Sequence, residues 1–246
     1  MNKHYLIHLP HAGREIPSQY LGDYLLSSEE LQKNIEQYCD LYTDELFGKL
    51  FENFDGVKSP YSRLFFDPER FGDDKQELMQ EKFKLGWFYE NTILQKKALR
   101  GTKNKQNIRK YFDKHHQVLN DKTAEKLALY DKCTVIDCHS FSNERYWFHD
   151  KDLKLPDICI GFEEKHVDEK LVDIIKEEFK EYEIGINTPY VGSLVPTNYW
   201  GKDKRVKSVM IEINKKLYLN EDNATKSDNF EFIKNKLDNI AKNLRD

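Results

Sequence analysis

Short apolar runs, each ending in polar residues, constrain the fold of this chain more than any other feature. They read HYLIHL, CTVIDCHS, PDICIG, EIGI and VKSVMIEI, and each has the length of a buried strand. Segments with helical periodicity alternate with them. We expect helices from Ser27 to about Phe51, from about Tyr89 to Tyr130 with a break near Gly101, from Val167 to about Phe179, and from about Asn229. Strands that alternate with helices predict an α/β fold with a mainly parallel sheet.

The length of the chain and the absence of internal repeats bear on its domain organisation. With 246 residues and no low-complexity linker, we expect a single domain over residues 1–246. A hydrophobic content of 39% is enough to build a sizeable core. Residues 67–86 lack clear periodicity and predict a long surface loop, and loops of that length are often functional.

Charge and the first residues narrow the class of partner. A formal net charge of -4 gives no reason to expect nucleic acid or an anionic membrane, because both favour basic patches. The amino-terminal apolar run is too short for a membrane span and lacks the pattern of a signal peptide. The four cysteines fit no CxxC spacing, so we expect no disulfide. These features favour a cytoplasmic protein that acts on a small molecule, and they leave the oligomeric state open.

Five positions lie at or just past the ends of the expected strands. In open α/β sheets, ligands bind in the crevice beyond the carboxyl ends of parallel strands. If the strands are parallel, these positions converge on one rim, where they would form a site. They are His11, His139, Gly161, Asn187 and Glu212.

The two histidines of this rim are candidate metal ligands. Asp137 and His139 share one face of their strand, and a buried acid beside an imidazole needs a compensating charge such as a metal or an arginine. Catalytic zinc sites commonly use two histidines and one carboxylate, with water in the fourth position. His11 and His139 would be the histidines. The carboxylate is either Glu15, on the loop of His11, or Asp40, which helical geometry places opposite the apolar stripe of the first helix.

Glu212 stands between Ile211 and Ile213 inside an apolar strand. Carboxylates are rarely buried without a partner. Either the strand lies at an edge and Glu212 faces solvent, or Glu212 is a general base beside a metal-bound water.

Arginine is rare in this chain, so the stretch SRLFFDPERF is a local concentration. Arg63 and Arg70 flank Asp67 there. They either pair with that acid or bind a carboxylate of a substrate, which arginine can hold through two hydrogen bonds. His116, next to His115 on a charged helix, carries no signal by itself.

Seven blocks of the sequence carry a resemblance to a known family. In order they are HLPHAGREIP, DLYTDELF, SRLFFDPERF, YFDKHHQVL, VIDCHSF, NTPYVGS and IEINKKLYL. Together they resemble the N-formylglutamate amidohydrolase family, from about Leu6 to Leu219. The resemblance implies a fold related to the zinc carboxypeptidases, with a central mixed, mainly parallel sheet flanked by helices. It also implies a metal-dependent enzyme that hydrolyses the amide between a small acyl group and an amino acid.

Carried over block by block, the resemblance also implies roles for individual residues. His11 and His139 would bind the metal, Glu212 would be the catalytic glutamate, and Arg63, Asn187 and His116 would lie in the substrate pocket. The family pattern favours Asp40 as the third ligand, whereas proximity in sequence favours Glu15, so both remain candidates. The arginine block of the family more typically reads SRYVVDLNR, and this chain has PER in place of LNR. The residues between Asp67 and Tyr89 also differ from the family.

Our hypothesis from the sequence is a zinc-dependent hydrolase of an N-acyl amino acid such as N-formylglutamate. Glu212 would be the general base, and Arg63, together with Arg70, would bind the substrate carboxylate and stabilise the oxyanion. The alternatives are a non-catalytic protein that binds an anionic small molecule at the same rim, a peptidase like the metallocarboxypeptidases, and a structural zinc site with a fourth protein ligand.

Overall fold

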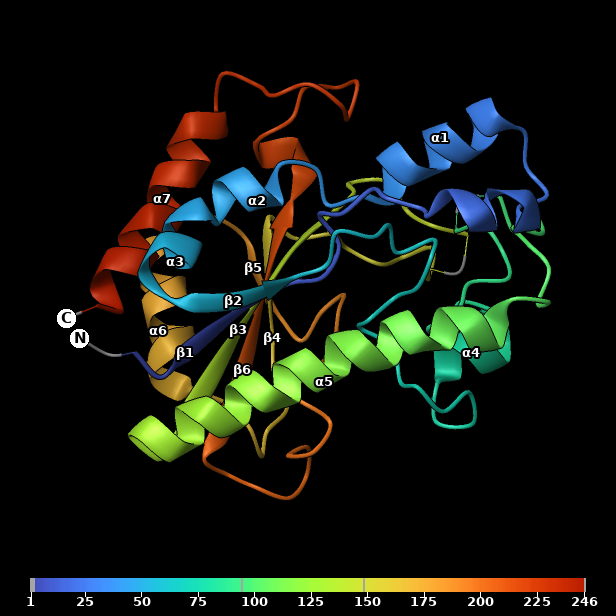
Figure 1. Cartoon of the computed structure of the whole chain (residues 1–246). Coiled ribbons are helices and arrows are strands. Elements are labelled where there is room, and N and C mark those ends of the chain that lie inside the picture. The colour runs from blue at the N-terminus through green and yellow to red at the C-terminus, as the bar shows by residue number, and fades with distance from the viewer. Residues whose placement is uncertain (1–2, 94, 148, 246) are drawn as a thin grey trace.

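The computed structural model describes residues 3–93, 95–147 and 149–245 of the chain (Figure 1). Its strands are β1 (Tyr5–Leu9), β2 (Asp55–Lys58), β3 (Cys133–Phe141), β4 (Ile158–Gly161), β5 (Ile184–Ile186) and β6 (Val206–Asn214). Its α-helices are α1 (Ser28–Tyr38), α2 (Thr43–Leu46), α3 (Gly48–Asn53), α4 (Leu78–Phe83), α5 (Lys105–Tyr130), α6 (Glu169–Glu178) and α7 (Phe230–Asn243). Two 3₁₀ helices complete the set, η1 (Ser18–Asp23) and η2 (Lys215–Leu217).

The six strands form one mixed sheet in the order β2-β1-β3-β6-β4-β5. Strands β2, β1, β3 and β6 are parallel to one another, whereas β4 pairs antiparallel with β6 and parallel with β5. The expected α/β domain with a mixed, mainly parallel sheet is therefore confirmed. However, β4 and β5 run against the other four strands, so the ends of β4 and β5 do not point toward the same rim as those of β1, β3 and β6.

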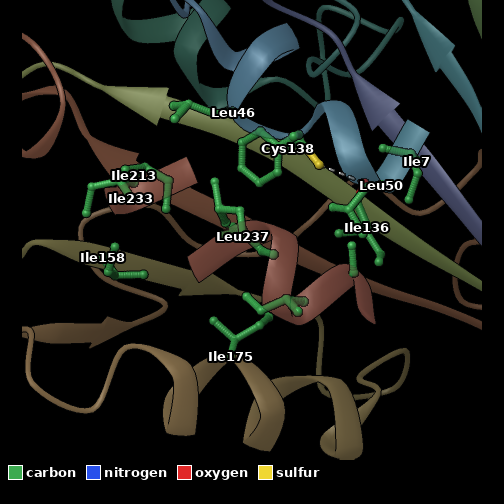
Figure 2. Close-up of a cluster of buried hydrophobic side chains, with 14 of the residues drawn as sticks. Ile7, Leu46, Leu50, Ile136, Cys138, Ile158, Ile175, Ile213, Ile233 and Leu237 are labelled. Atoms are coloured by element: carbon green, nitrogen blue, oxygen red, sulfur yellow. Dashed lines mark hydrogen bonds between the residues drawn. The ribbon is translucent and has the colours of Figure 1, made fainter. Parts of the chain in front are cut away.

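Helices cover both faces of the sheet. Helices α2, α3, α6 and α7 lie on one face, on the left of Figure 1, and α5 crosses the other. The main core lies under the first group, where Ile136, Ile213 and Leu237 belong to one buried cluster (Figure 2). On the face of α5, a smaller cluster joins Leu6 and Val135 to Leu119. Both faces of the sheet are thus buried, as the near-continuous apolar runs of the strands require.

Helix α1 begins with the predicted capping box and ends earlier than expected. The side chain of Ser27 accepts a hydrogen bond from the backbone of Glu30, and the Glu30 carboxylate accepts one from the backbone of Ser27. We expected this helix to continue to about Phe51, but it stops at Tyr38. The chain then makes an extended step and a left-handed turn at Tyr42, with φ of 61°, before α2 and α3. Apolar residues continue at helical spacing across this break, so the sequence pattern does not reveal where the helix ends.

Two other expectations about local structure were also wrong in detail. Residues 67–86 are not one loop, because they contain α4. The long charged helix begins at Lys105 and not near Tyr89. The preceding residues form an irregular segment held by isolated bridges, among them Tyr24 with Arg100 and Asn91 with Ala98. In the part of the chain that the structure describes, the four cysteines are free and buried, and no helix is long and apolar enough to span a bilayer.

Arg100 connects the segments that surround the sheet ends. It is only 4% exposed, and its guanidinium donates hydrogen bonds to the carbonyl of Tyr89, the carbonyl of Phe65 and the hydroxyl of Tyr24. Its Cζ also lies 3.6 Å from the centroid of the Phe88 ring. The planar, permanently charged group therefore joins three stretches of irregular chain that would otherwise leave buried carbonyl groups without donors.

We expect Arg100→Met to lower the free energy of unfolding by at least about 3 kcal/mol, because it leaves two buried carbonyls without donors. Urea denaturation would measure this change. Arg205→Met, at an exposed arginine, is the matched control and should leave the free energy of unfolding almost unchanged. Equal stability of the two variants would contradict this interpretation of Arg100.

Candidate active site

A cavity of about 800 Å³ lies at the carboxyl ends of β1, β3 and β6. It brings together seven of the nine residues for which the sequence suggested a catalytic, substrate-binding or metal-binding role. These are His11, Asp40, Arg63, Arg70, His116, His139 and Glu212. The other two, Glu15 and Asn187, do not belong to its lining.

His11, Asp40 and His139 lie together at the buried end of this cavity. The Nδ1 atom of His139 is 3.4 Å from Asp40 Oδ2, and the Nδ1 atom of His11 is 3.8 Å from the same oxygen. The two imidazole rings are 5.0 Å apart between centroids, and all three residues are at most 3% exposed. One nitrogen of each ring and one carboxylate oxygen lie within 4.8 Å of one another, and such a set of atoms could hold a divalent metal ion.

Local chain geometry explains how Asp40 reaches the histidines. The break after α1 takes Asp40 out of the helix, and its backbone N–H donates to the carbonyl of His11. Its carboxylate accepts a hydrogen bond from the backbone N–H of Ser140, next to His139. On the other side, Gly13 packs so closely on Pro60 that a Cβ atom would lie 2.3 Å from the Pro60 carbonyl carbon. The loop after β1 is thereby pressed against the loop after β2.

The other ring nitrogen of each histidine makes a hydrogen bond to a carboxylate other than Asp40. His11 Nε2 donates to Asp67 Oδ1 at 2.7 Å, and His139 Nε2 donates to Asp137 Oδ1 at 3.0 Å. The shared face of Asp137 and His139, expected from their spacing, brings about the second of these bonds. Histidines that bind metals commonly donate their other N–H to a carboxylate, which fixes the ring and its tautomer. The Nδ1 atom of His11 makes no hydrogen bond within the described structure.

Burial and neighbouring charges set the protonation of this group. Burial, reinforced by Arg63, lowers the pKa of His11 to about 4, so its imidazole is neutral at neutral pH. Burial also acts to lower the pKa of His139, but Asp137 and Asp40 outweigh it and raise that pKa well above the usual value. A positive charge between Asp40 and Asp137 is thus favoured in the chain without metal.

Glu212 lies opposite His139 in the register of β3 and β6. Its strand is central in the sheet, so the alternative of an exposed edge strand is wrong. Glu212 is 7% exposed, and its Oε2 atom has no hydrogen-bond partner in the described structure. Burial raises the pKa of Glu212 to about 8, although the nearby His139 acts in the opposite direction. A carboxylate with this pKa can both take up and release a proton near neutral pH.

The two arginines lie beside Asp67, on the irregular chain after β2. The Nη2 atom of Arg63 donates to Asp67 Oδ2 at 2.8 Å, and Arg70 Nε lies 3.8 Å from the same oxygen. Tyr89 also donates its hydroxyl to this carboxylate. The ion pair that we considered for Asp67 is therefore present, and both guanidinium groups still contribute to the lining of the cavity. The Nε atoms of both have no hydrogen-bond partner in the described structure.

Glu15 and Asn187 have other surroundings. Glu15 is exposed, because the chain after Gly13 runs beside residues 60–62 and pairs with Tyr61. Of the two acids considered as third ligand, Asp40 is the one beside both histidines. Asn187 follows the reversed strand β5, and its side chain bonds the backbone of Phe162 and of Gly192. It thereby shapes the loop that lines the cavity.

Sequence analysis did not identify some of the residues that belong to the site. His8 is fully buried and donates from Nδ1 to Asp137, while its Nε2 atom lies 2.8 Å from Nε2 of His115. Glu69 lies 3.2 Å from His8 Nδ1. A histidine inside an apolar strand was the available signal for His8. Lys215 is 4% exposed, and its ammonium donates to the carbonyl of Cys39, beside Asp40. Nothing in its sequence context distinguishes it from other lysines.

The fold and these residues define an α/β protein with a buried cluster of histidines and carboxylates at the carboxyl ends of its central strands. The model of one protein family, N-formylglutamate amidohydrolase, matches residues 4–219. The chain therefore belongs to the N-formylglutamate amidohydrolase family, and membership of this family supports an enzyme that hydrolyses amides.

Two solved structures resemble this one in fold. The N-formylglutamate amidohydrolase from Ralstonia eutropha JMP134 superposes with a TM-score of 0.78 at 18% identity, over 99% of this chain and 94% of that one. A gene product from Agrobacterium tumefaciens gives a TM-score of 0.63 at 18% identity, over 99% and 92% of the two chains. Among curated protein sequences, none matches this chain.

Proposed function

We propose that this protein is a metal-dependent hydrolase that cleaves the amide bond of an N-acyl amino acid. The observation that carries the proposal is the buried group of His11, Asp40 and His139 beside Glu212, in a chain of an amidohydrolase family. Zinc fits this donor set best, because two imidazole nitrogens and one carboxylate oxygen are typical of catalytic zinc sites.

The residues of the site fit such an ion. His11 Nδ1 is buried without a hydrogen bond, and the partners of the other ring nitrogens, Asp67 and Asp137, would keep both rings in place. Two groups of three candidate ligands occur among the described residues, one of His11, Asp40 and His139 and one of His8, Glu69 and Asp137, and the first is the one that lies wholly in the lining of the cavity. Three protein ligands leave a position for water or substrate, which favours a catalytic site over a structural one with a fourth protein ligand. A bound divalent ion would polarise the amide carbonyl and lower the pKa of water.

Glu212 is the residue we assign to proton transfer. It lies across from His139, and in its ionised form it can accept a proton from the attacking water. The same carboxyl group can then return the proton to the nitrogen of the leaving amine. Its burial keeps competing water away from this exchange and raises its basicity compared with an exposed carboxylate.

Arg63 and Arg70 are the residues that we assign to the carboxylate of the substrate. Their guanidinium groups line the cavity next to the histidines, and each has an Nε–H without a partner in the described structure. Asp67 fixes Arg63 by an ion pair and so reduces the entropy that the side chain loses when a substrate binds. Arg63 can also donate to the oxyanion that forms during hydrolysis. His116 would complete this wall, and Asn187 would act through the loop that it shapes.

The test is hydrolysis of N-formyl and other N-acyl amino acids by purified protein with and without metal. We expect activity with zinc, loss of activity after chelation, and recovery when zinc is added back. The released amine would be measured over time. Undiminished hydrolysis by protein shown to be metal-free would overturn the metal dependence, and binding of the same compounds without turnover would favour a non-catalytic binding protein.

A further inference from the structure

The cavity is much larger than the group that carries out the chemistry. Its volume of about 800 Å³ lies in the upper part of the range for sites that enclose drug-sized ligands. A formyl group and the short side chain of glutamate would leave most of this volume to water. The residues that line the rest of the cavity therefore carry information about the substrate.

One wall of the cavity is the face of a hydrophobic cluster. This cluster is built around Leu64, Leu85 and Tyr89, under α1 and beside α4. Its members that line the cavity are Tyr38, Met79, Phe83, Leu85, Tyr89, Ile93 and Tyr146. A wall of this composition gains free energy by covering apolar surface and gives little to a carboxylate.

The apolar wall lies on the side of the arginines. The Cζ atom of Arg63 is 6.0 Å from the centroid of the Tyr89 ring, and Tyr89 donates to Asp67, the acid between the two arginines. A substrate whose α-carboxylate binds Arg63 would thus have its side chain close to this wall. The acyl group would be at the opposite end of the amide, toward the histidines.

The charges of the lining argue against a second carboxylate on the substrate. Three basic residues, Arg63, Arg70 and Lys215, line the cavity among the described residues. Five acids face them, namely Asp40, Glu69, Glu77, Glu163 and Glu212. Arg63 is already paired with Asp67, and Lys215 is bound to a backbone carbonyl. Arg63 and Arg70 both lie beside Asp67 and are assigned to the α-carboxylate, so a second carboxylate of a dianionic substrate would find no further arginine in the described lining of the cavity.

We infer that the preferred substrate is an N-formyl amino acid with a single carboxylate and a bulky apolar or aromatic side chain, which packs on the wall formed by Met79, Phe83, Leu85 and Tyr89. This inference rests on the proposed function, and it assigns to the chain a substrate other than N-formylglutamate. The wall takes the place that a cationic pocket would need to occupy if the side chain carried a carboxylate.

The experiment compares kcat/KM of the zinc-loaded protein for N-formyl-L-leucine, N-formyl-L-phenylalanine, N-formyl-L-glutamate and N-hexanoyl-L-glutamate. We expect at least one of the two apolar amino acids to exceed N-formylglutamate by about tenfold or more, since apolar contacts of one or two carbons give discrimination of this size. A preference for N-formylglutamate would overturn the inference while leaving the proposed function intact. A preference for the hexanoyl compound would overturn the assignment of the wall to the side chain.

A variant tests the wall itself. Phe83→Arg adds a cation to the apolar wall, so the ratio of kcat/KM for the apolar substrate to that for N-formylglutamate should fall at least tenfold. Leu129→Arg changes an exposed leucine outside the cavity and should leave the ratio unchanged. An unchanged ratio in folded Phe83→Arg would contradict the inference.

Failure of the proposed function is separable from failure of this inference. If none of the compounds is hydrolysed, calorimetric binding of N-formyl-L-phenylalanine and N-formyl-L-glutamate still decides the side-chain preference. Tighter binding of the phenylalanine compound would support the inference without catalysis, and tighter binding of the glutamate compound would overturn it.

Discussion

Glu212→Gln is expected to lower kcat for amide hydrolysis by a factor of about 10² to 10⁴, the usual contribution of a general base, while the protein keeps its fold and its metal. Glutamine has nearly the shape of glutamate but cannot accept the proton of the attacking water. Because Glu212 is buried opposite His139, no other carboxylate on β6 can replace it. Steady-state kinetics with the best N-formyl substrate would measure the loss.

The matched control is Glu163→Gln, which makes the same substitution at an exposed glutamate in the lining of the same cavity. It should retain kcat within a factor of a few. Metal content and thermal unfolding of both variants would show whether the site is intact. A Glu212→Gln protein that is folded, holds metal and turns over at the rate of the wild type would refute the assignment of the general base.

The second large effect concerns the third metal ligand. We expect Asp40→Asn to weaken zinc binding by more than the 10- to 100-fold that is typical of losing an outer partner, and His139→Ala to do the same. Asparagine keeps an oxygen that can accept the hydrogen bond from the backbone of Ser140. The conformation of the chain after α1 should therefore be preserved. Zinc affinity would be measured by competition with a chelating dye.

Glu15→Gln serves as the comparison, since Glu15 is the acid that sequence proximity to His11 favours. Its exposed position predicts wild-type affinity for zinc. Circular dichroism of the metal-free proteins would establish that all variants are folded. If Glu15→Gln lost zinc and Asp40→Asn kept it, the ligand group described here would be wrong.

Several parts of the fold could be predicted from the sequence because they depend on local periodicity. The apolar runs predicted five of the six described strands, all except β2, and Ser27 with Glu30 predicted the start of α1. The spacing of Asp137 and His139 predicted their shared face, and the structure has the hydrogen bond between them. Features of this kind are determined by residues that are close together in the sequence.

Other features depend on contacts between distant segments, which periodicity cannot reveal. The helical pattern continues through Cys39 and Tyr42, although the backbone of Asp40 leaves the helix to bond His11. The prediction that placed Asp40 on a regular helix was therefore wrong about the surroundings of its side chain. The reversal of β4 is likewise set by its pairing with β6 and not by any residue within ICIG.

The order of the strands in the sheet also bears on when the site forms during folding. His8 and Asp137 are 129 positions apart, and β3 finds its other neighbour, β6, only after β4, α6 and β5 have been made. Parallel pairing across such distances is slow, because the entropy of closing long loops is lost before the contacts form. During synthesis the histidines leave the ribosome well before Glu212. The cavity residues contributed by the chain after β1, by the chain after α1 and by β3 therefore precede Glu212 in synthesis, and the site is complete only once β6 lies between β3 and β4.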